Sequence, residues 1–177
     1  MTDKKLEALR FPIGRLKYEA ADFVEKKDSQ IQTLATIPQK MRAIVADMSE
    51  ADLNTPYRPG GWTARQVIHH VADSHMNAYI RFKWALTEDS PMIKAYDEAA
   101  WATLSDYNDT PVEVSLALLE NLHKRWVILL KKMTETQWNK EIGHPEWTKN
   151  LNMKFMLGMY DWHSRHHLGH LEIVKNG

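Results

Sequence analysis

Residues 110–130 read TPVEVSLALLENLHKRWVILL and carry the clearest helical signal of the chain. Thr110 fits a helix N-cap, Pro111 fits the first helical position, and Glu113 is spaced to close a capping box with Thr110. The residues that then recur on one helical face are Leu116, Leu119, Leu122, Trp126, Leu129 and Leu130. The stretch therefore predicts an amphipathic helix whose apolar face packs into a core.

Two further long segments show the same helical period. One spans roughly Lys154 to Val174. The other lies near the amino terminus, and Pro38 is expected to kink it or to mark its restart. Its apolar residues are Ile31, Leu34, Ile37, Met41, Ile44, Val45 and Met48.

A fourth long helix is expected to begin at Thr63, after the turn-prone PGG at 59–61, because Thr63 and Gln66 fit a capping box. It should continue to about Leu86. A short helix is expected after Thr134, which has a glutamine at the same capping-box spacing. Since no segment shows convincing strand-type alternation, the sequence predicts an all-α protein, a four-helix bundle.

The connections refine this topology. The segment from Thr87 to Pro111 is long for a link between adjacent antiparallel helices, so we expect one long crossover between parallel neighbours. Within it, AYDEAAWATL is expected to form one or two helical turns. Residues 1–177 are interpreted as a single domain, with residues 1–28 as an amino-terminal arm and residues 29–177 as the helical bundle.

Composition excludes several classes of protein. Lys+Arg and Asp+Glu balance at 23 each, so no net charge attracts nucleic acid or an anionic membrane. No apolar run is long enough to span a bilayer, and the amino terminus lacks the apolar core of a signal peptide. With no cysteine, the protein has neither disulfides nor a thiol nucleophile of its own. A cytoplasmic location is expected.

Seven of the nine histidines fall in two short segments, VIHHVADSH and WHSRHHLGH. The second holds two overlapping pairs, His163 with His167 and His166 with His170. Side chains four residues apart stack on one helical face, so two imidazoles of such a pair can bind one ion. A third histidine from the other segment leaves the open coordination position that distinguishes a catalytic metal site from a structural one. The pattern predicts a metal enzyme.

Helical geometry separates the histidines of the first segment. A polar stripe beside the apolar face contains Thr63, His70, Ser74, Asn77 and Arg81. His70 thus lies at the edge of the core among groups that bind ligands. His69 points away and is interpreted as a surface residue, whereas His75 falls in the apolar arc and is interpreted as buried and hydrogen-bonded.

Helical geometry does not show which histidines of the second segment would bind a metal ion. All four of its histidines fall inside the apolar arc of their helix, which is costly unless a metal ion or a polar pocket engages them. The spacing favours neither of the two pairs over the other. Outside the two segments, His123 is interpreted as a buried core histidine or as a residue that contacts the metal ligands. His144 lies in the loop GHPEW and is interpreted as a turn residue that can rim a pocket.

Five sequence motifs along the chain resemble those of a known protein family. TPYRPGGWTARQVIHHVADSHMNAYIRFKWALTE, AYDEAAW, SLALLENLHKRW, GHPEW and YDWHSRHHLGHLE, in this order, resemble the YfiT-like group of the DinB superfamily. The resemblance implies a four-helix bundle, a homodimer and one divalent metal ion per subunit. Three imidazole ligands suit zinc or nickel. Carried over by motif, the metal ligands are His70, His163 and His167.

The resemblance also implies a choice of chemistry. Members are described as metal-dependent hydrolases, which act through a metal-bound hydroxide, with Asp97 as a candidate catalytic base. Related proteins transfer a low-molecular-weight thiol of the bacillithiol type to a small electrophile, and we place this activity slightly ahead because no base is evident. Candidate substrate-binding residues are Asn77, Arg81, Tyr96 and Trp101. A non-catalytic metal-binding stress protein is the third alternative.

Overall fold

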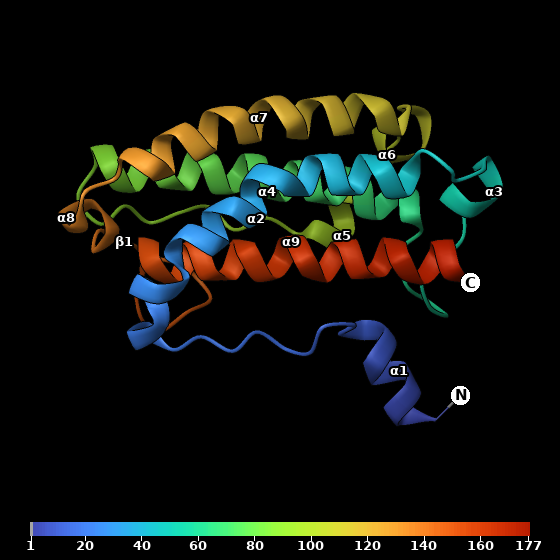
Figure 1. Ribbon diagram of the computed structural model, residues 1–177, viewed down its shortest axis with the longest axis horizontal. Helices are drawn as coiled ribbons and strands as arrows, with labels where there is room; N and C mark the ends of the chain where they lie inside the picture. Colours follow the sequence, from blue (N-terminus) through green and yellow to red (C-terminus); the bar gives the residue numbers. More distant parts are fainter. Residues whose placement is uncertain (1) are drawn as a thin grey trace.

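The computed structural model describes residues 2–177, which form a bundle of four long helices (Figure 1). These helices are α2 Phe23–Val45, α4 Ala64–Thr87, α7 Val112–Lys132 and α9 Met153–Asn176. Helix α2 packs against α7 and α9, and α4 packs against the same two helices. Helices α2 and α4 therefore occupy opposite corners of the bundle, and the predicted all-α, four-helix architecture is confirmed.

Short elements connect and flank the bundle. The helical ones are α1 Asp3–Arg10, η1 Ala20–Asp22, α3 Glu50–Leu53, α5 Glu98–Trp101, α6 Asp106–Asp109 and α8 Glu135–Trp138. Two-residue strands, β1 Glu141–Ile142 and β2 Leu151–Asn152, pair antiparallel just before α9. Within residues 2–177, every helix is too short or too polar to cross a bilayer.

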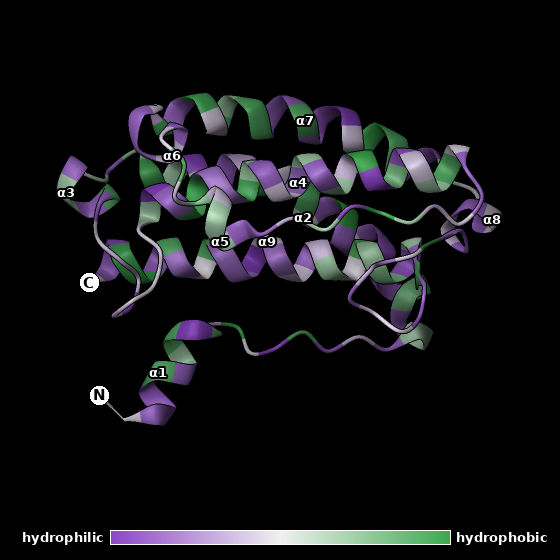
Figure 2. Cartoon of the chain, turned by 180° about the vertical axis from the view of Figure 1, so that it is seen from behind, coloured by the Kyte–Doolittle hydropathy of each residue, from purple (hydrophilic) through white to green (hydrophobic). Residues whose placement is uncertain are grey.

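The connection between α4 and α7 is the predicted crossover. The sequence colours of Figure 1 show α4 and α7 running in the same direction, so the chain must return along the bundle between them. Residues 88–111 make this return and carry α5 and α6. Figure 2 shows the returning segment lying along α4 and α9, which is how residues of this segment reach the site described below.

Two of the three predicted capping boxes are present. At the start of α4, the backbone N–H of Gln66 donates to Thr63 Oγ1 over 3.2 Å, and the N–H of Thr63 donates to Gln66 Oε1 over 3.0 Å. Thr134 and Gln137 make the same reciprocal pair before α8. These caps satisfy N–H groups that have no partner within the helix, and they fix where the chain enters each helix.

The predicted capping box at Thr110 is wrong. Helix α7 begins at Val112 without a side-chain cap, because both groups of the box bind elsewhere. The N–H of Thr110 donates to the carbonyl of Asp106 in α6, and the Glu113 carboxylate accepts from Arg42 Nη1 of α2 at 2.6 Å. Contacts with residues of α6 and α2 have thus replaced the expected pairing of Thr110 with Glu113.

Helix α2 differs from the expected segment at its start. It begins at Phe23, within the stretch assigned to an arm, because the Phe23 ring is buried against Trp138 at a centroid distance of 5.2 Å. The helix continues through Pro38, so of the two effects expected of this proline it does not mark a restart. Proline has no N–H, so the carbonyl four residues earlier, that of Leu34, loses its helical donor.

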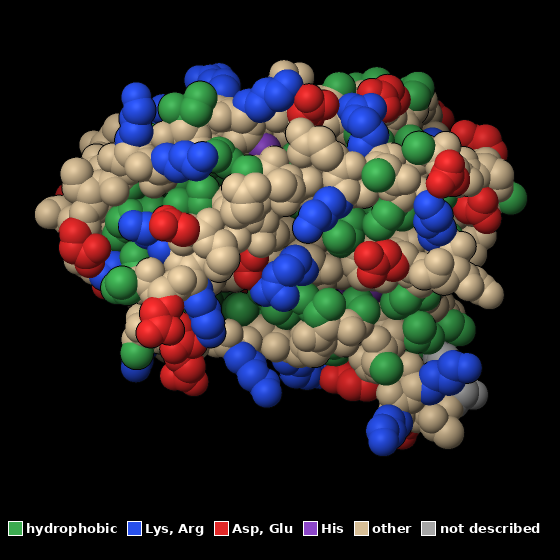
Figure 3. All heavy atoms as spheres, in the orientation of Figure 1, with side chains coloured by type: hydrophobic (Ala, Val, Ile, Leu, Met, Phe, Trp, Pro, Cys, Tyr) green, Lys and Arg blue, Asp and Glu red, His purple; other side chains and the backbone are tan. Residues whose placement is uncertain are grey.

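The buried interior is divided into three layers. One apolar cluster, around Phe82 and Trp126, fills the end of the bundle near α8, and another, around Val67 and Leu119, fills the opposite end. Along their helices, His75 of α4, His123 of α7 and the buried histidines of α9 lie between these clusters. Figure 2 shows apolar and polar residues alternating around each long helix, and in Figure 3 histidine scarcely appears on the surface of this face.

Candidate metal centre

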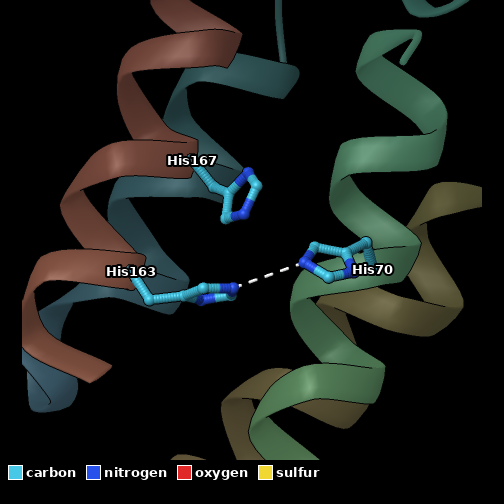
Figure 4. Close-up of side chains that lie close together, drawn as sticks. All are labelled: His70, His163 and His167. Atoms are coloured by element: carbon cyan, nitrogen blue, oxygen red, sulfur yellow. Dashed lines mark hydrogen bonds between the residues drawn. The ribbon is translucent and has the colours of Figure 1, made fainter. Parts of the chain in front are cut away.

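Three histidines from two antiparallel helices converge beside the crossover segment. His70 comes from α4, and His163 and His167 come from successive turns of α9. One ring nitrogen from each lies within 4.8 Å of those of the other two. Figure 4 shows the three rings pointing toward one another across the space between the helices. The arrangement is the one expected of three ligands around a single ion.

The geometry and chemistry of this trio fit a divalent metal. His70 Nε2 and His163 Nε2 are 3.3 Å apart, and two ligands at 2.0–2.1 Å from a tetrahedral ion are separated by about 3.3–3.4 Å. Burial, with the nearby His166, lowers the pKa of His70 to about 4. Burial also lowers the pKa of His163 and His167 well below the usual value. All three are therefore neutral at pH 7, the form that binds metals.

A second histidine group shares one member with the first. Ring nitrogens of His166, His167 and His170 also lie within 4.8 Å of one another. His170, however, is closed in: its ring stacks on Tyr57 at 3.8 Å, and its Nε2 lies 3.3 Å from the carbonyl of Arg10. The first group differs because all three of its members face a cavity. An ion with an open coordination position fits the first group better.

This cavity has a volume of about 360 Å³. Its walls come from α4, α9, the crossover segment and the loop after β1. The aromatic residues that line it are Trp62, Tyr96, Tyr160 and Trp162. Burial raises the pKa of Tyr96 to about 12, so its hydroxyl remains protonated and can donate a hydrogen bond. The space is of a size that accommodates a small organic molecule.

The positively and negatively charged side chains that line the cavity lie in different parts of it. Arg81 is 8% exposed, and Nη1 donates a long hydrogen bond of 3.4 Å to the hydroxyl of Tyr160. In residues 2–177 the Arg81 guanidinium has no ion-pair partner. The carboxylates that line the cavity, Glu98 and Glu146, belong to exposed residues. The inner wall of the cavity is thus cationic and its rim is acidic.

Only some of the predicted catalytic and substrate-binding residues line this cavity. Trp101 lies behind Tyr96, with ring centroids 4.4 Å apart, and does not line the cavity. Asn77 Nδ2 donates to the carbonyl of Asp73, also outside the lining. Asp97 is exposed, and its Oδ1 accepts from the N–H of Ala100 as the cap of α5. Arg81 and Tyr96 are therefore the predicted substrate-binding residues that the cavity contains.

Several residues that line the cavity were not among the site residues predicted from the sequence. Tyr160 lies three residues before His163 on the same face of α9, so helical spacing offered a signal for it. Trp62, whose ring lies 4.6 Å from that of His70, precedes the N-cap of α4 and has no periodicity to reveal it. His144, interpreted from the sequence as a turn residue in a loop that can rim a pocket, lines the cavity.

The interpretation of His69 as a surface residue is wrong. Its side chain is buried, Nδ1 lies 2.7 Å from Ser115 Oγ of α7, and its ring packs beside that of Tyr107 of α6. The crossover segment covers this side of α4, which its own periodicity does not reveal. The prediction that His75 is buried and hydrogen-bonded is confirmed.

Fold and site together define a class of protein, an all-α bundle whose histidine cluster can hold a metal ion. The family model of the DinB superfamily matches residues 33–171, and the chain belongs to this superfamily.

Individual relatives agree over nearly the whole chain. "Putative metal-dependent hydrolase YfiT" of Bacillus subtilis strain 168 is 47% identical over 163 residues, 92% of each chain. A Bacillus cereus ATCC 10987 protein named "Putative metal-dependent hydrolase" is 48% identical over 167 residues, 94% of this chain and 95% of its own. The solved structure of B. subtilis YfiT, described as "a probable metal-dependent hydrolase with an unusual four-helix bundle topology", matches with a TM-score of 0.92. It is 45% identical and covers 96% of this chain and 97% of its own.

Proposed function

We propose that this protein is a metal-dependent enzyme that transfers a low-molecular-weight thiol, of the bacillithiol type, to a small electrophile. In this reaction a sulfur–carbon bond forms, the bond from carbon to the leaving group breaks, and the thiol proton departs with the leaving group. One observation carries the proposal: the three-histidine cluster opens on a cavity whose inner wall holds an unpaired guanidinium and no carboxylate.

In this proposal His70, His163 and His167 hold one divalent ion per subunit. Three neutral imidazoles suit zinc, nickel and other first-row metals. The bound ion supplies the Lewis acidity that lowers the pKa of a thiol or a water molecule at its open position. A thiol needs little further help, because its unperturbed pKa of about 8.5 is already close to neutrality. The lack of a protein cysteine means that the sulfur must come from a cosubstrate.

Arg81 supports an anionic thiol cosubstrate. Burying a cation without a partner is costly, and Arg81 is buried at the cavity wall with one long hydrogen bond. A carboxylate in the cavity would accept two hydrogen bonds from the guanidinium, the geometry that arginine favours. The protonated hydroxyl of Tyr96 offers a further donor, and Trp101 behind it keeps the ring in place. Asn77 lies outside the cavity and plays at most an indirect part.

Hydrolysis is the second candidate, and the names of the relatives favour it. In this case a water molecule at the open position is the nucleophile and the cavity accommodates an ester or an amide. Asp97, the base suggested by the sequence, is already engaged as the cap of α5, so Glu98 or Glu146 at the rim would have to assist. Few carboxylates lie near the three histidines to act as a general base, so the site supports hydrolysis less well than thiol transfer.

Cobalt substitution tests the proposal. We expect a sulfur-to-cobalt charge-transfer band when a small thiol carrying a carboxylate is added to the Co²⁺-loaded protein. Arg81→Met should raise the thiol concentration that gives half of the maximal band by about tenfold or more, because it removes both charge-assisted hydrogen bonds to the carboxylate. Arg125→Met, which removes an exposed arginine from α7, is the matched control and should leave the titration unchanged.

Two outcomes would overturn the thiol proposal. Ester or amide cleavage by the metal-loaded protein without any thiol, together with no charge-transfer band, would establish hydrolysis instead. Retained metal without turnover on hydrolase and thiol-transfer substrates would favour a protein that only binds the ion.

We also propose a cytoplasmic homodimer. A reduced thiol pool is a property of the cytoplasm, and twofold dimers are the commonest closed assembly. Helix α7 exposes three large apolar side chains, Val114, Leu118 and Ile128, which a second copy would cover. Light scattering at micromolar concentration should give twice the 20.6 kDa mass of the chain, and a monomer would contradict this expectation.

A further inference from the structure

Two buried histidines have no part in the proposed chemistry. His75 of α4 is 0% exposed and His123 of α7 is 1% exposed. They lie in the layer between the two apolar clusters, where an imidazole without partners would be costly. Their rings stack with centroids 4.9 Å apart. Each of their four ring nitrogens has a hydrogen-bonding partner, so the pair belongs to a larger network.

The network is a chain that begins at a proposed metal ligand. His163 Nδ1 lies 3.1 Å from His75 Nε2. His75 Nδ1 lies 2.7 Å from His123 Nε2. His123 Nδ1 lies 2.5 Å from the carbonyl oxygen of Leu34 in α2. The chain thus crosses the bundle from the partly buried His163 of α9, through the buried His75 of α4 and His123 of α7, to α2.

The chain ends at Leu34 because of a proline. In an α-helix the carbonyl of residue 34 accepts from the N–H of residue 38. Position 38 is Pro38, which has no N–H, yet α2 continues through it. The Leu34 carbonyl is therefore a buried acceptor without its helical donor, and His123 Nδ1–H takes that place. The proline in the middle of α2 and the buried histidine of α7 form one unit.

The carbonyl sets the direction of every hydrogen bond in the chain. A carbonyl oxygen only accepts, so His123 carries its proton on Nδ1 and presents a lone pair at Nε2. That lone pair accepts from His75 Nδ1–H, and His75 Nε2 then accepts from His163 Nδ1–H. With its proton on Nδ1, His163 presents the lone pair of Nε2, the nitrogen that faces His70 Nε2 at 3.3 Å.

We propose that His75 and His123 are positioning residues that, through the Leu34 carbonyl freed by Pro38, hold His163 in the tautomer that offers Nε2 to the metal ion. A neutral imidazole exists as two tautomers, and the one protonated on Nε2 cannot bind an ion through that atom. Hydrogen bonding of the other ring nitrogen selects the tautomer and fixes the ring orientation. The chain does both for His163.

The other ligand of α9 has a shorter chain of the same kind. His167 Nδ1 lies 3.3 Å from His170 Nδ1, and His170 Nε2 lies 3.3 Å from the Arg10 carbonyl. By the same reasoning His167 presents Nε2. The amino-terminal arm reaches this position because Gly169 has no Cβ, which would stand 2.9 Å from Pro12 Cγ. Both ligands of α9 are thus tied to a main-chain carbonyl.

Nitrogen-15 NMR of the metal-free, histidine-labelled protein tests the chain without any substitution. Ring ¹⁵N shifts report which nitrogen carries the proton, and we expect Nδ1–H for His163, His75 and His123. Protonation of His75 or His123 on Nε2 would reverse the chain and overturn the proposal. The proposal rests on the metal ligands but not on the reaction, so failure of the thiol-transfer assignment leaves it intact.

Zinc affinity, measured by competition with a chromogenic chelator, tests the consequence. His123→Leu should weaken binding by about tenfold, the lower end of the 10–100-fold effect of removing a direct partner of a ligating histidine, because His123 acts on His163 through His75. His123→Gln should recover most of the loss, because its amide can accept from His75 and donate to Leu34. His69→Leu is the control, since it also removes a buried, hydrogen-bonded histidine but one outside the chain.

The proposal fails if His123→Leu binds zinc as tightly as the unmodified protein, or if His69→Leu loses as much affinity. Circular dichroism establishes that each variant is folded before its affinity is compared. Should His123→Leu not fold, the NMR measurement on the unmodified protein decides alone.

Discussion

Alanine at His70, His163 or His167 is expected to abolish stoichiometric metal binding. Each substitution leaves two imidazoles where three converge, and the loss of a direct ligand should exceed the roughly 100-fold upper effect of losing an outer partner. Metal content after dialysis, followed by chelator competition for zinc, measures the change. The three variants should behave alike, because each ligand completes the same site.

His69→Ala is the matched control for these variants. His69 is buried on α4 beside His70 but bonds Ser115, away from the cavity. Its loss should leave the metal content at that of the unmodified protein. If His166→Ala and His170→Ala abolish binding while His163→Ala does not, the ion occupies the other histidine group instead.

Acid is expected to destabilise the metal-free protein steeply. The pKa of His70 and of His123 is about 4 in the folded state, mainly through burial, against about 6.5 in an unfolded chain. Between these values the unfolded state binds more protons, so the free energy of unfolding falls as the pH falls. The loss begins near pH 6.5 and is complete near pH 4.

From pH 7 to pH 5 each of the two histidines should lower the free energy of unfolding by about 2 kcal/mol. Their sum of about 4 kcal/mol is a large part of the 5–15 kcal/mol typical of a domain. Urea unfolding of the EDTA-treated protein at the two pH values measures it. In His123→Gln, which lacks one titrating group, the difference should shrink by about 2 kcal/mol, the contribution of His123. A free energy of unfolding that is unchanged within about 1 kcal/mol would contradict the prediction.

The fold was largely predictable because its signals are local. Apolar spacing marks the long helices, and the capping boxes at Thr63 and Thr134 mark where two helices begin. The crossover followed from the length of one connection. The prediction failed at Thr110, where the N–H and the carboxylate of the expected box bind Asp106 and Arg42 instead. Those partners come from α6 and α2, which spacing within one helix does not reveal.

Residue spacing alone predicted the site only up to a choice between two histidine pairs, and the family resemblance selected His163 and His167. Spacing on α9 places both histidine pairs inside the apolar arc, and which pair meets α4 depends on how the two helices pack. The packing brings His163 Nε2 to within 3.3 Å of His70 Nε2. The contacts of His123 depend on packing in the same way, since its partner is a main-chain carbonyl of another helix. Pro38 was read as a kink, and only the fold shows the acceptor that it frees.

An anomalous difference map from crystals of the zinc-loaded protein, recorded at the zinc edge, would locate the metal ion and its ligands. We expect one peak per subunit, about 2.0–2.1 Å from Nε2 of His70, His163 and His167, with an open side facing the cavity near Tyr96 and Arg81. A peak enclosed by His166, His167 and His170, or no peak in protein shown to contain zinc, would contradict it.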